Sequence, residues 1–312
     1  MPLPLKNFFY RIFVRIRNLW LFAATLNYRE VRKKIKLSKT AFSPSADQVF
    51  VASSFRVSNQ QRQEIFKVSL RETLRHLTGT AIKVKIRDAS PEEFSRQNRI
   101  FLNDLAGNNL DYKAETLNLN ADYKELLETS EEKYFCMAFD DQPIFGLFPE
   151  FLSAATALLE DFAGSVDMML IEQLNGFDID ISNKQIILEQ QSLDFQARGI
   201  EPLGTVKYGN YSFAILNNFH YGFFFNTLIA PCKDYASRLK WYMEHVSQDK
   251  PHRIEKAGMY YRGPVYKYIA VPLQVFMLNI DFLHTDISVR GTTGKEKRIF
   301  EVLKNNYSIK YN

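Results

Sequence analysis

Hydrophobic and polar residues alternate with two different periods along residues 48–172. Short runs rich in β-branched and aromatic residues are typical of buried strands, and such runs fall at 48–55, 81–88, 133–141 and 166–173. The segments between them repeat apolar residues every three to four positions, which predicts amphipathic helices. Strands that alternate with helices in this way predict an α/β fold with a mostly parallel central sheet and right-handed crossovers.

Three helices are expected between these strands. The first follows Ser58 or Asn59, either of which can cap its first turn, and Gly79 ends it. The second is expected at about 91–105 and the third at 149–164. In an open α/β sheet of this kind, ligands bind outside the carboxyl ends of the strands. Candidate chemistry is therefore expected where the strands end.

Polar side chains follow three of the predicted strands. These strand ends read Ser53 to Arg56, Arg87 to Ser90, and Asp140 to Gln142. The last is the most informative, because two adjacent carboxylates repel each other and neither can enter an apolar interior without a partner. One interpretation is a strand that runs out into a solvated turn at Pro143. The other is a cation-binding site at the carboxyl end of a central strand.

The order of these motifs resembles that of inverting, family 2 type nucleotide-sugar glycosyltransferases, which have a Rossmann-like A-type fold. The resemblance covers about residues 48–172, and the motifs that carry it are VASSFR (51–56), IRDAS (86–90) and FDDQPIFGLFPEFLSAATALLED (139–161). No single motif is specific, and the likeness lies in their order and spacing. Two departures are that IRDAS lacks the usual glycine and that Gln142 stands where the family commonly has a second acid.

The resemblance implies a role for each strand end. Donor binding falls to the first strand end, with Ser54, Phe55 and Arg56. Asp88 would read the nucleotide base, and Asp140 would lie near the ribose or the metal. Asp141 would be the metal ligand. Three possibilities stay open: Asp141 takes the metal, Gln142 contributes a neutral oxygen, or the enzyme works with little or no metal.

The implied cofactor is a divalent cation, Mn²⁺ or Mg²⁺. A nucleotide-sugar donor leaves as a diphosphate, so negative charge builds on the leaving oxygens, and a cation neutralises it. One or two protein carboxylates suffice, because the substrate phosphates supply further ligands.

An inverting transfer also needs a base that deprotonates the acceptor hydroxyl. His252 and Glu255 are the candidates, with Glu255 favoured, because residues three positions apart share a helix face. A surface pair at a helix entry is the alternative.

Basic residues are concentrated near the N-terminus. Residues 1–40 hold ten Lys or Arg against one acid, a net charge of +9, and because the whole chain carries +5 the remainder carries −4. A nucleic-acid binder more usually distributes its basic residues over a folded face, so this asymmetry argues against nucleic acid as a partner. Within residues 6–26 a polar stripe of Arg and Asn lies opposite large apolar residues, which is typical of a helix at a membrane surface. A helix packed on the protein's own core or on a partner subunit is the alternative.

Four segments are predicted. Residues 1–37 form a basic amphipathic membrane-interface helix, 38–47 a linker, 48–172 the nucleotide-sugar-binding α/β half, and 173–312 the acceptor-binding half with C-terminal helices. The longest uncharged N-terminal run is too short to span a bilayer, so a cytoplasmic protein bound peripherally to the inner membrane face is expected. The two cysteines show no metal-ligand spacing, which fits a reducing compartment.

The expected function is transfer of a sugar from a nucleotide-sugar donor to a cell-surface glycan or a lipid-linked acceptor, as in polysaccharide biosynthesis. Two alternatives stay open. A sugar nucleotidyltransferase would normally have a glycine-rich first loop, and SSFRVSNQQ (53–61) lacks the glycines. A catalytically silent module of the same fold would bind a nucleotide-sugar or a partner protein, and both Gln142 and the lack of a matched base motif leave room for it.

Overall fold

The computed structural model describes most of the predicted α/β half and parts of the rest of the chain. The described residues are 28–36, 48–114, 119–174, 180–182, 185–188, 202–217, 225–245, 268–278, 280, 293–305 and 308–311. The predicted membrane-interface helix at 6–26 and the linker at 38–47 lie outside these residues, as do His252 and Glu255. None of the described helices is long and apolar enough to cross a membrane.

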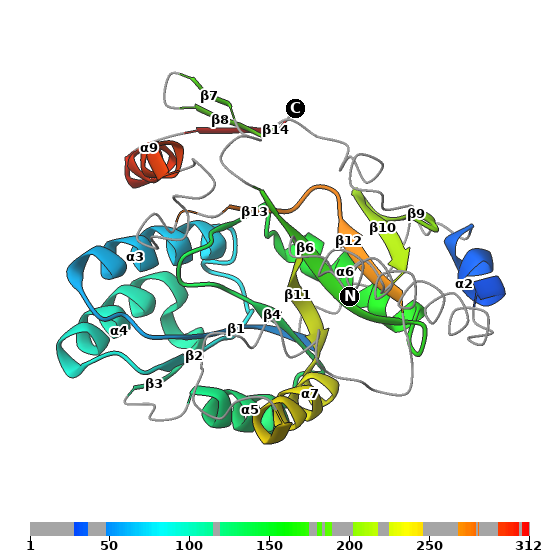
Figure 1. Cartoon of the computed structure of the whole chain (residues 1–312), viewed down its shortest axis with the longest axis horizontal. Coiled ribbons are helices and arrows are strands. Elements are labelled where there is room, and N and C mark those ends of the chain that lie inside the picture. The colour runs from blue at the N-terminus through cyan, green and yellow to red at the C-terminus, as the bar shows by residue number, and fades with distance from the viewer. Residues whose placement is uncertain are drawn as a thin grey trace, which may run out of the picture.

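Helices and strands alternate through residue 174, with elements, β3 and α5 among them, beyond those that the sequence predicts (Figure 1). The described helices are α2 (Tyr28–Ile35), α3 (Gln60–Leu74), α4 (Glu92–Ala106), η2 (Gly107–Asn109), α5 (Leu119–Thr129), α6 (Pro149–Asp161), α7 (Cys232–His245) and α9 (Thr293–Lys304). The described strands are β1 (Val49–Phe55), β2 (Val84–Asp88), β3 (Leu110–Lys113), β4 (Tyr134–Met137), β5 (Ile144–Phe145), β6 (Val166–Leu174), β7 (Asp180–Ser182), β8 (Gln185–Leu188), β9 (Gly204–Tyr208), β10 (Tyr211–Asn217), β11 (Phe225–Pro231), β12 (Tyr268–Pro272), β13 (Phe276–Leu278) and β14 (Ser308–Tyr311).

The central sheet confirms the predicted fold class. Its main path runs β3-β2-β1-β4-β11-β6-β12-β10-β9. Of these nine strands, seven run in one direction, and β11 and β10 run in the other. The order β3-β2-β1-β4 matches one half of the Rossmann strand order. The chain therefore has an α/β fold with a mostly parallel central sheet.

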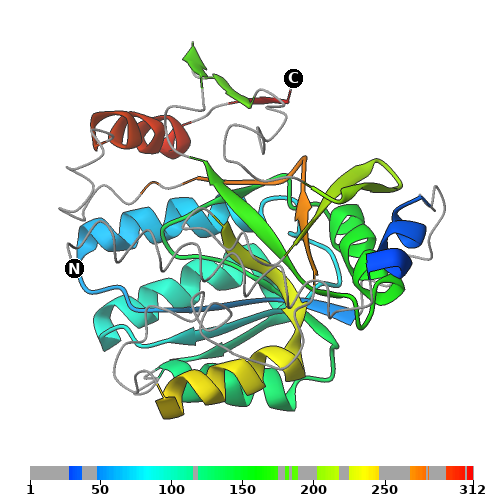
Figure 2. The ribbon, with the colours of Figure 1, turned by 45° about the vertical axis from the view of Figure 1, so that its right-hand side comes forward.

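Helices cover both faces of the parallel part of this sheet. α3 and α4 lie on one face, and α5 and α7 lie together on the other (Figure 2). The chain changes faces after β3, because β4 is added on the far side of β1. β1 and β4 are buried along almost their whole length, as expected for strands covered on both sides.

Helix α3 begins and ends close to where the sequence predicts. The side chain of Asn59 accepts a hydrogen bond from the backbone N–H of Arg62, so Asn59 is the N-cap. The helix itself ends at Leu74, and a turn follows in which Gly79 has a φ of +78°. Phe66, Leu70 and Leu74 of α3 belong to the main core with the sheet, whereas Ile65 and Val68 belong to a second cluster with residues of β5, β13 and α9.

Strands from the second half of the chain extend the same sheet. β11 lies between β4 and β6, and β12, β10 and β9 continue beyond β6. A separate three-stranded sheet, β14-β8-β7, lies near α9 at the top of Figure 1. Helix α9 packs over α3, where Lys304 Nζ lies 2.8 Å from Glu64 Oε2.

Residues 28–35 of the predicted N-terminal segment form helix α2, which packs on the sheet. Val31 is fully buried, and Lys34 Nζ donates to the backbone carbonyl of Asp161 at 2.8 Å. α2 also contacts β9, where Ile35 lies against Gly204. This part of the segment therefore belongs to the folded body. Whether residues 6–26 bind a membrane stays a prediction.

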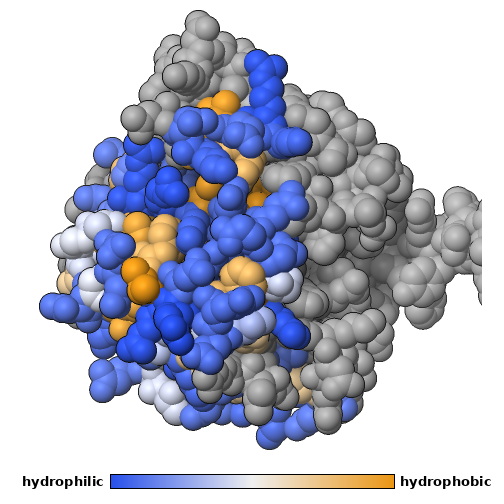
Figure 3. Space-filling view, turned by 90° about the vertical axis from the view of Figure 1, so that its left-hand side faces the viewer, coloured by the Kyte–Doolittle hydropathy of each residue, from blue (hydrophilic) through white to orange (hydrophobic). Residues whose placement is uncertain are grey.

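The surface on the left-hand side of Figure 1, where β1 leads into α3, is mostly hydrophilic. In the space-filling view of that side, the apolar residues form small separate spots among charged and polar ones (Figure 3). Ile100 of α4 is a large apolar side chain that is exposed, at 60%. Single exposed apolar residues of this kind are normal on a protein surface.

Candidate functional site

The carboxyl ends of β1, β2 and β4 meet at one edge of the sheet. Phe55 at the end of β1 pairs with Asp88 at the end of β2. Two further hydrogen bonds join the turns beyond them: Ala89 N–H donates to the Phe55 carbonyl at 2.9 Å, and Val57 N–H donates to Ser90 Oγ at 2.7 Å. β4 runs parallel to β1 on its other side. The acid pair that follows β4 is therefore on the same edge as the other two strand ends.

The three predicted donor-binding residues of β1 differ in their surroundings. Ser54 is half-buried, Phe55 is buried with its ring centroid 4.4 Å from that of Phe66, and Arg56 is exposed. Phe55 thus packs between the sheet and α3. Donor contact by Ser54, Phe55 and Arg56 stays a prediction.

Asp88 lies at the centre of a buried hydrogen-bond network. Its side chain is 0% exposed, and its oxygens accept from the N–H of Ser90, the Nδ2 of Asn98 and the hydroxyl of Tyr112. Gln63 of α3 joins through Nε2, which donates to Asn98 Oδ1 at 3.2 Å. Burial and the hydrogen bond to Asp88 raise the pKa of Tyr112 well above its usual range, so Tyr112 stays protonated and donates.

This network makes Asp88 a positioning residue for the strand end. It fixes Ser90, whose hydroxyl in turn receives Val57 N–H, and so it holds the turns after β1 and β2 together. The predicted contact between Asp88 and a nucleotide base is not tested by this geometry and stays a prediction.

Asp140 and Asp141 face the guanidinium of Arg62. Nη2 of Arg62 lies 3.4 Å from Asp140 Oδ2, and Nη1 lies 3.5 Å from Asp141 Oδ2. The side chains of Arg62, Asp140 and Asp141 are 20%, 22% and 19% exposed. Both carboxylates are therefore paired with one guanidinium and do not stand in a freely solvated turn, and a cation site at this edge stays a prediction.

The loop that carries the two acids is held from both sides. On the α3 side, Ser69 Oγ donates to the Phe139 carbonyl at 2.8 Å, and Ile144 N–H donates to Thr73 Oγ1 at 3.0 Å. Ser69 and Thr73 are themselves buried. On the other side, Leu278 N–H at the end of β13 donates to the Pro143 carbonyl at 3.0 Å, and Ile280 N–H donates to the Asp141 carbonyl at 3.4 Å. The backbone around the acid pair is therefore tied to both α3 and the β13 segment.

These donors fit a divalent cation only with help from a substrate. In the described part of the chain, no group of three or more His, Cys, Asp or Glu is placed to hold a metal ion. Gln142 Oε1 accepts from Asn226 Nδ2 at 3.4 Å, so the amide oxygen points toward β11. Two carboxylates are enough for Mn²⁺ or Mg²⁺ when substrate phosphates provide the remaining oxygens, so metal binding here stays a prediction.

Sequence reasoning missed Arg62, although one signal was present. Arg62 is the third residue of α3, near the positive end of the helix dipole, where a cation is unfavourable. A basic residue there indicates a compensating negative group nearby, and the structure shows that group to be the acid pair. The candidate bases His252 and Glu255 lie outside the described residues and stay predictions.

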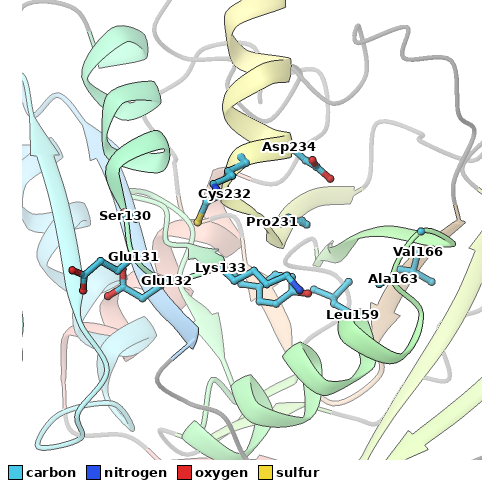
Figure 4. A pocket seen from close by; sticks show the side chains of 13 residues that line it. Ser130, Glu131, Glu132, Lys133, Leu159, Ala163, Val166, Pro231, Cys232 and Asp234 are labelled. Atoms are coloured by element: carbon cyan, nitrogen blue, oxygen red, sulfur yellow. The ribbon is translucent and has the colours of Figure 1, made fainter.

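A cavity of about 640 Å³ lies at the opposite edge of the sheet. Its lining side chains come from the start of β4, the end of α6 and the start of α7, and they include Lys133, Leu159 and Cys232 (Figure 4). β4 begins at Tyr134 beside this cavity, whereas the acid pair follows the end of the same strand. The cavity is therefore separate from the candidate site.

Comparisons with known proteins find similarity to solved structures alone. No protein-family model and no curated protein sequence matches it. Among similar solved structures, S. aureus TarS 1–349 has a TM-score of 0.41 at 11% identity, covering 82% of this chain and 71% of that one. Galactosyltransferase LgtC, solved in complex with donor and acceptor sugar analogs, has a TM-score of 0.37 at 12% identity, covering 81% and 95%.

A 4-diphosphocytidyl-2C-methyl-D-erythritol synthase from Anaerococcus prevotii is similar to the same degree. Its TM-score is 0.38 at 10% identity, covering 73% of this chain and 88% of that one. Because these identities are near 10% and these TM-scores are below 0.5, the similarity concerns the general fold and assigns no role to any residue.

Proposed function

We propose that this protein is a glycosyltransferase that moves a sugar from a nucleotide-sugar donor to a cell-surface glycan or a lipid-linked acceptor. The observation that carries this proposal is the acid pair at the carboxyl edge of the sheet, with both carboxylates directed at one cationic group. Ligands bind at this edge in open α/β sheets. The order of motifs along residues 48–172 resembles the family 2 type enzymes and supports the same activity.

The chemistry of the donor explains why acids and a basic residue would share this edge. Cleavage of the sugar–phosphate bond leaves negative charge on a diphosphate, and a divalent cation neutralises that charge when bound. Asp141 would hold this cation, with Asp140 beside it, and Gln142 would add a neutral oxygen only by turning Oε1 away from Asn226 Nδ2. The buried network around Asp88 and Ser90 would keep the donor-binding turns in place. An acceptor hydroxyl would lose its proton to Glu255 or His252, with inversion at the sugar carbon.

The acceptor and the location follow from the N-terminal segment. A basic amphipathic helix at residues 6–26 would hold the enzyme at the inner face of the cell membrane, where a lipid-linked acceptor is concentrated. Basic residues on α2, among them Arg32 and Lys33, are exposed and would add to the attraction for anionic lipids.

A sugar-transfer assay tests this proposal. The purified chain is incubated with radiolabelled UDP-, GDP-, CMP- and dTDP-sugars and with bacterial lipid extract, and transfer into the lipid or glycan fraction is measured. Asp141→Ala is expected to abolish transfer while the far-ultraviolet circular dichroism stays unchanged. Asp104→Ala, which removes an exposed carboxylate from α4, serves as the matched control and is expected to retain activity. Binding of a nucleotide-sugar without any transfer or hydrolysis would instead identify a catalytically silent module.

A further inference from the structure

A second hydrophobic cluster holds helix α9 on the rest of the chain, over α3 (Figure 1). Ile299, Phe300 and Leu303 of α9 are buried in this cluster, and no described side chain of α9 belongs to the main core. The ion pair of Lys304 with Glu64 adds little, because the two side chains are 45% and 41% exposed. Apolar burial therefore keeps α9 in place. The cluster consists of Ile65, Val68, Phe145, Phe276, Leu278, Ile280, Ile299, Phe300 and Leu303.

The same cluster reaches the loop that carries the acid pair. Phe145 belongs to β5, the short strand that follows this loop, and it pairs with Phe276 of β13. Among the described strands, β5 pairs with β13 alone. The N–H groups of Leu278, at the end of β13, and of Ile280 donate to backbone carbonyls of the loop. The residues whose backbone holds the loop therefore bury their side chains in the cluster that α9 completes.

Neighbouring residues of β5 and β13 face opposite sides. Ile144 and Met277 are buried in the main core, whereas Phe145, Phe276 and Leu278 are buried in the second cluster. β13 also pairs with the end of β6, so it is anchored to the central sheet on one side. If α9 came away, the second face of the β5–β13 pair would meet water, and a strand pair this short is only marginally stable without a covered face.

We propose that α9 is a strap that holds the acid-bearing loop, and that α9, the β5–β13 pair and this loop open together as one cooperative unit. Such units open at a lower free energy than the whole protein does. α9 can leave while the central sheet stays folded, because its burial is not shared with the main core. The inference goes beyond the proposed function, because it does not depend on the acids binding any ligand.

Native-state hydrogen exchange on the full chain, followed by nuclear magnetic resonance, tests the strap with two matched variants. Ile299 in α9 and Ile86 in β2 are both 0% exposed, and Ile→Val makes the same small truncation at each. Ile299→Val is expected to accelerate exchange of the α9 amides and of the Ile144, Leu278 and Ile280 amides by one common factor, about two- to tenfold. Ile86→Val is expected to leave these amides unchanged and to accelerate the amides of β1 and β2, which only global unfolding exposes.

A larger truncation in the same cluster gives a stronger signal. Leu303→Ala should accelerate the amides of α9 and of the acid-bearing loop about thirtyfold or more, provided that the variant folds. The two Ile→Val variants decide the question without it, because each removes little from the core.

Either of two results would overturn the proposal. If Ile299→Val accelerates the α9 amides but not those of Ile144, Leu278 and Ile280, then α9 does not hold the loop. If Ile86→Val accelerates the loop amides as much as it accelerates those of β1, the loop exchanges only through global unfolding and no separate unit exists. The proposed function fails separately, in a chain that binds no nucleotide-sugar, and that failure would leave the exchange result standing.

Discussion

Glu72 in α3 is a buried carboxyl group, and its burial predicts how the free energy of unfolding depends on pH. Its side chain is 5% exposed, and it lies between Ser69 and Thr73, which hold that loop. Burial raises the pKa of Glu72 from 4.5 to about 7, although Arg75 and Arg71 act in the opposite direction. Arg75 Nη1 lies 3.6 Å from the Glu72 carboxylate and lowers its pKa, but by less than burial raises it.

The sign of the effect on stability follows from this raised pKa. Between about pH 4.5 and pH 7 the folded protein holds a proton on Glu72 that the unfolded chain has released, so the free energy of unfolding falls as pH rises through this interval. Above about pH 7 Glu72 is ionised in both the folded and the unfolded state, so the free energy of unfolding falls no further on its account. The difference between 4.5 and about 7 corresponds to about 3 kcal/mol at most, at about 1.4 kcal/mol for each pH unit.

Glu72→Gln removes the ionisable group and keeps the shape. We expect this variant to be more stable than the wild type by about 1–3 kcal/mol at pH 8, with the gain shrinking toward zero by pH 4.5. Urea unfolding at several pH values measures it, and Glu125→Gln on the exposed side of α5 is the control. A gain that is the same at pH 5 and pH 8, or no gain at pH 8, would refute the reasoning.

Two further predictions concern a glycine and the cysteines. Gly146 has a φ of +81°, and a Cβ there would lie 2.8 Å from the Gln274 carbonyl oxygen, so Gly146→Ala should lower stability by about 2–4 kcal/mol. Gly164→Ala, with a φ of +80° and open space around the site, should cost clearly less in the same urea experiment, and equal losses would contradict the clash. Burial raises the pKa of Cys232 to about 12 and raises that of Cys136 further, so neither thiol should react with a thiol reagent at pH 8 until urea unfolds the chain. Rapid labelling of the native protein would show that they are accessible.

The sequence was sufficient to predict most helices and strands of residues 48–174, although it missed β3 and α5. The helices α3, α4 and α6 and the strands β1, β2, β4 and β6 appear where the apolar periodicity indicates them, because each buries one face or both. The sequence left Ser58 and Asn59 as candidate caps for α3, and the structure shows that Asn59 is the cap.

The order in which the strands pair in the sheet could not be predicted from the local sequence pattern. β11 enters the sheet between β4 and β6, although it follows β6 by about fifty residues, and no local pattern marks that pairing. β3 was also missed, because its four residues alternate exposed and half-buried positions and lie in a polar segment. Strand order depends on packing across the whole sheet, whereas periodicity reports only the surroundings of one element.

In the candidate site, too, the sequence indicated single residues but not the contacts between residues that are far apart in the chain. Asp140 and Asp141 stood out as like charges at a strand end, and the structure places them at the predicted edge. Their contact with Arg62 joins residues almost eighty positions apart, and it becomes visible only when α3 and the loop after β4 are side by side. Asp88, in contrast, is so thoroughly hydrogen-bonded by the protein that its burial could not be inferred from IRDAS alone.

The central claim is that the edge carrying the acid pair binds a nucleotide-sugar together with a divalent cation. Thermal-shift binding of UDP-, GDP-, CMP- and dTDP-linked sugars, each with and without Mn²⁺, tests it most directly. The account predicts that one nucleotide class stabilises the protein, that Mn²⁺ increases this stabilisation, and that Asp141→Ala loses the increase. A well-folded sample whose melting temperature responds to none of these ligands, with or without Mn²⁺, would contradict it.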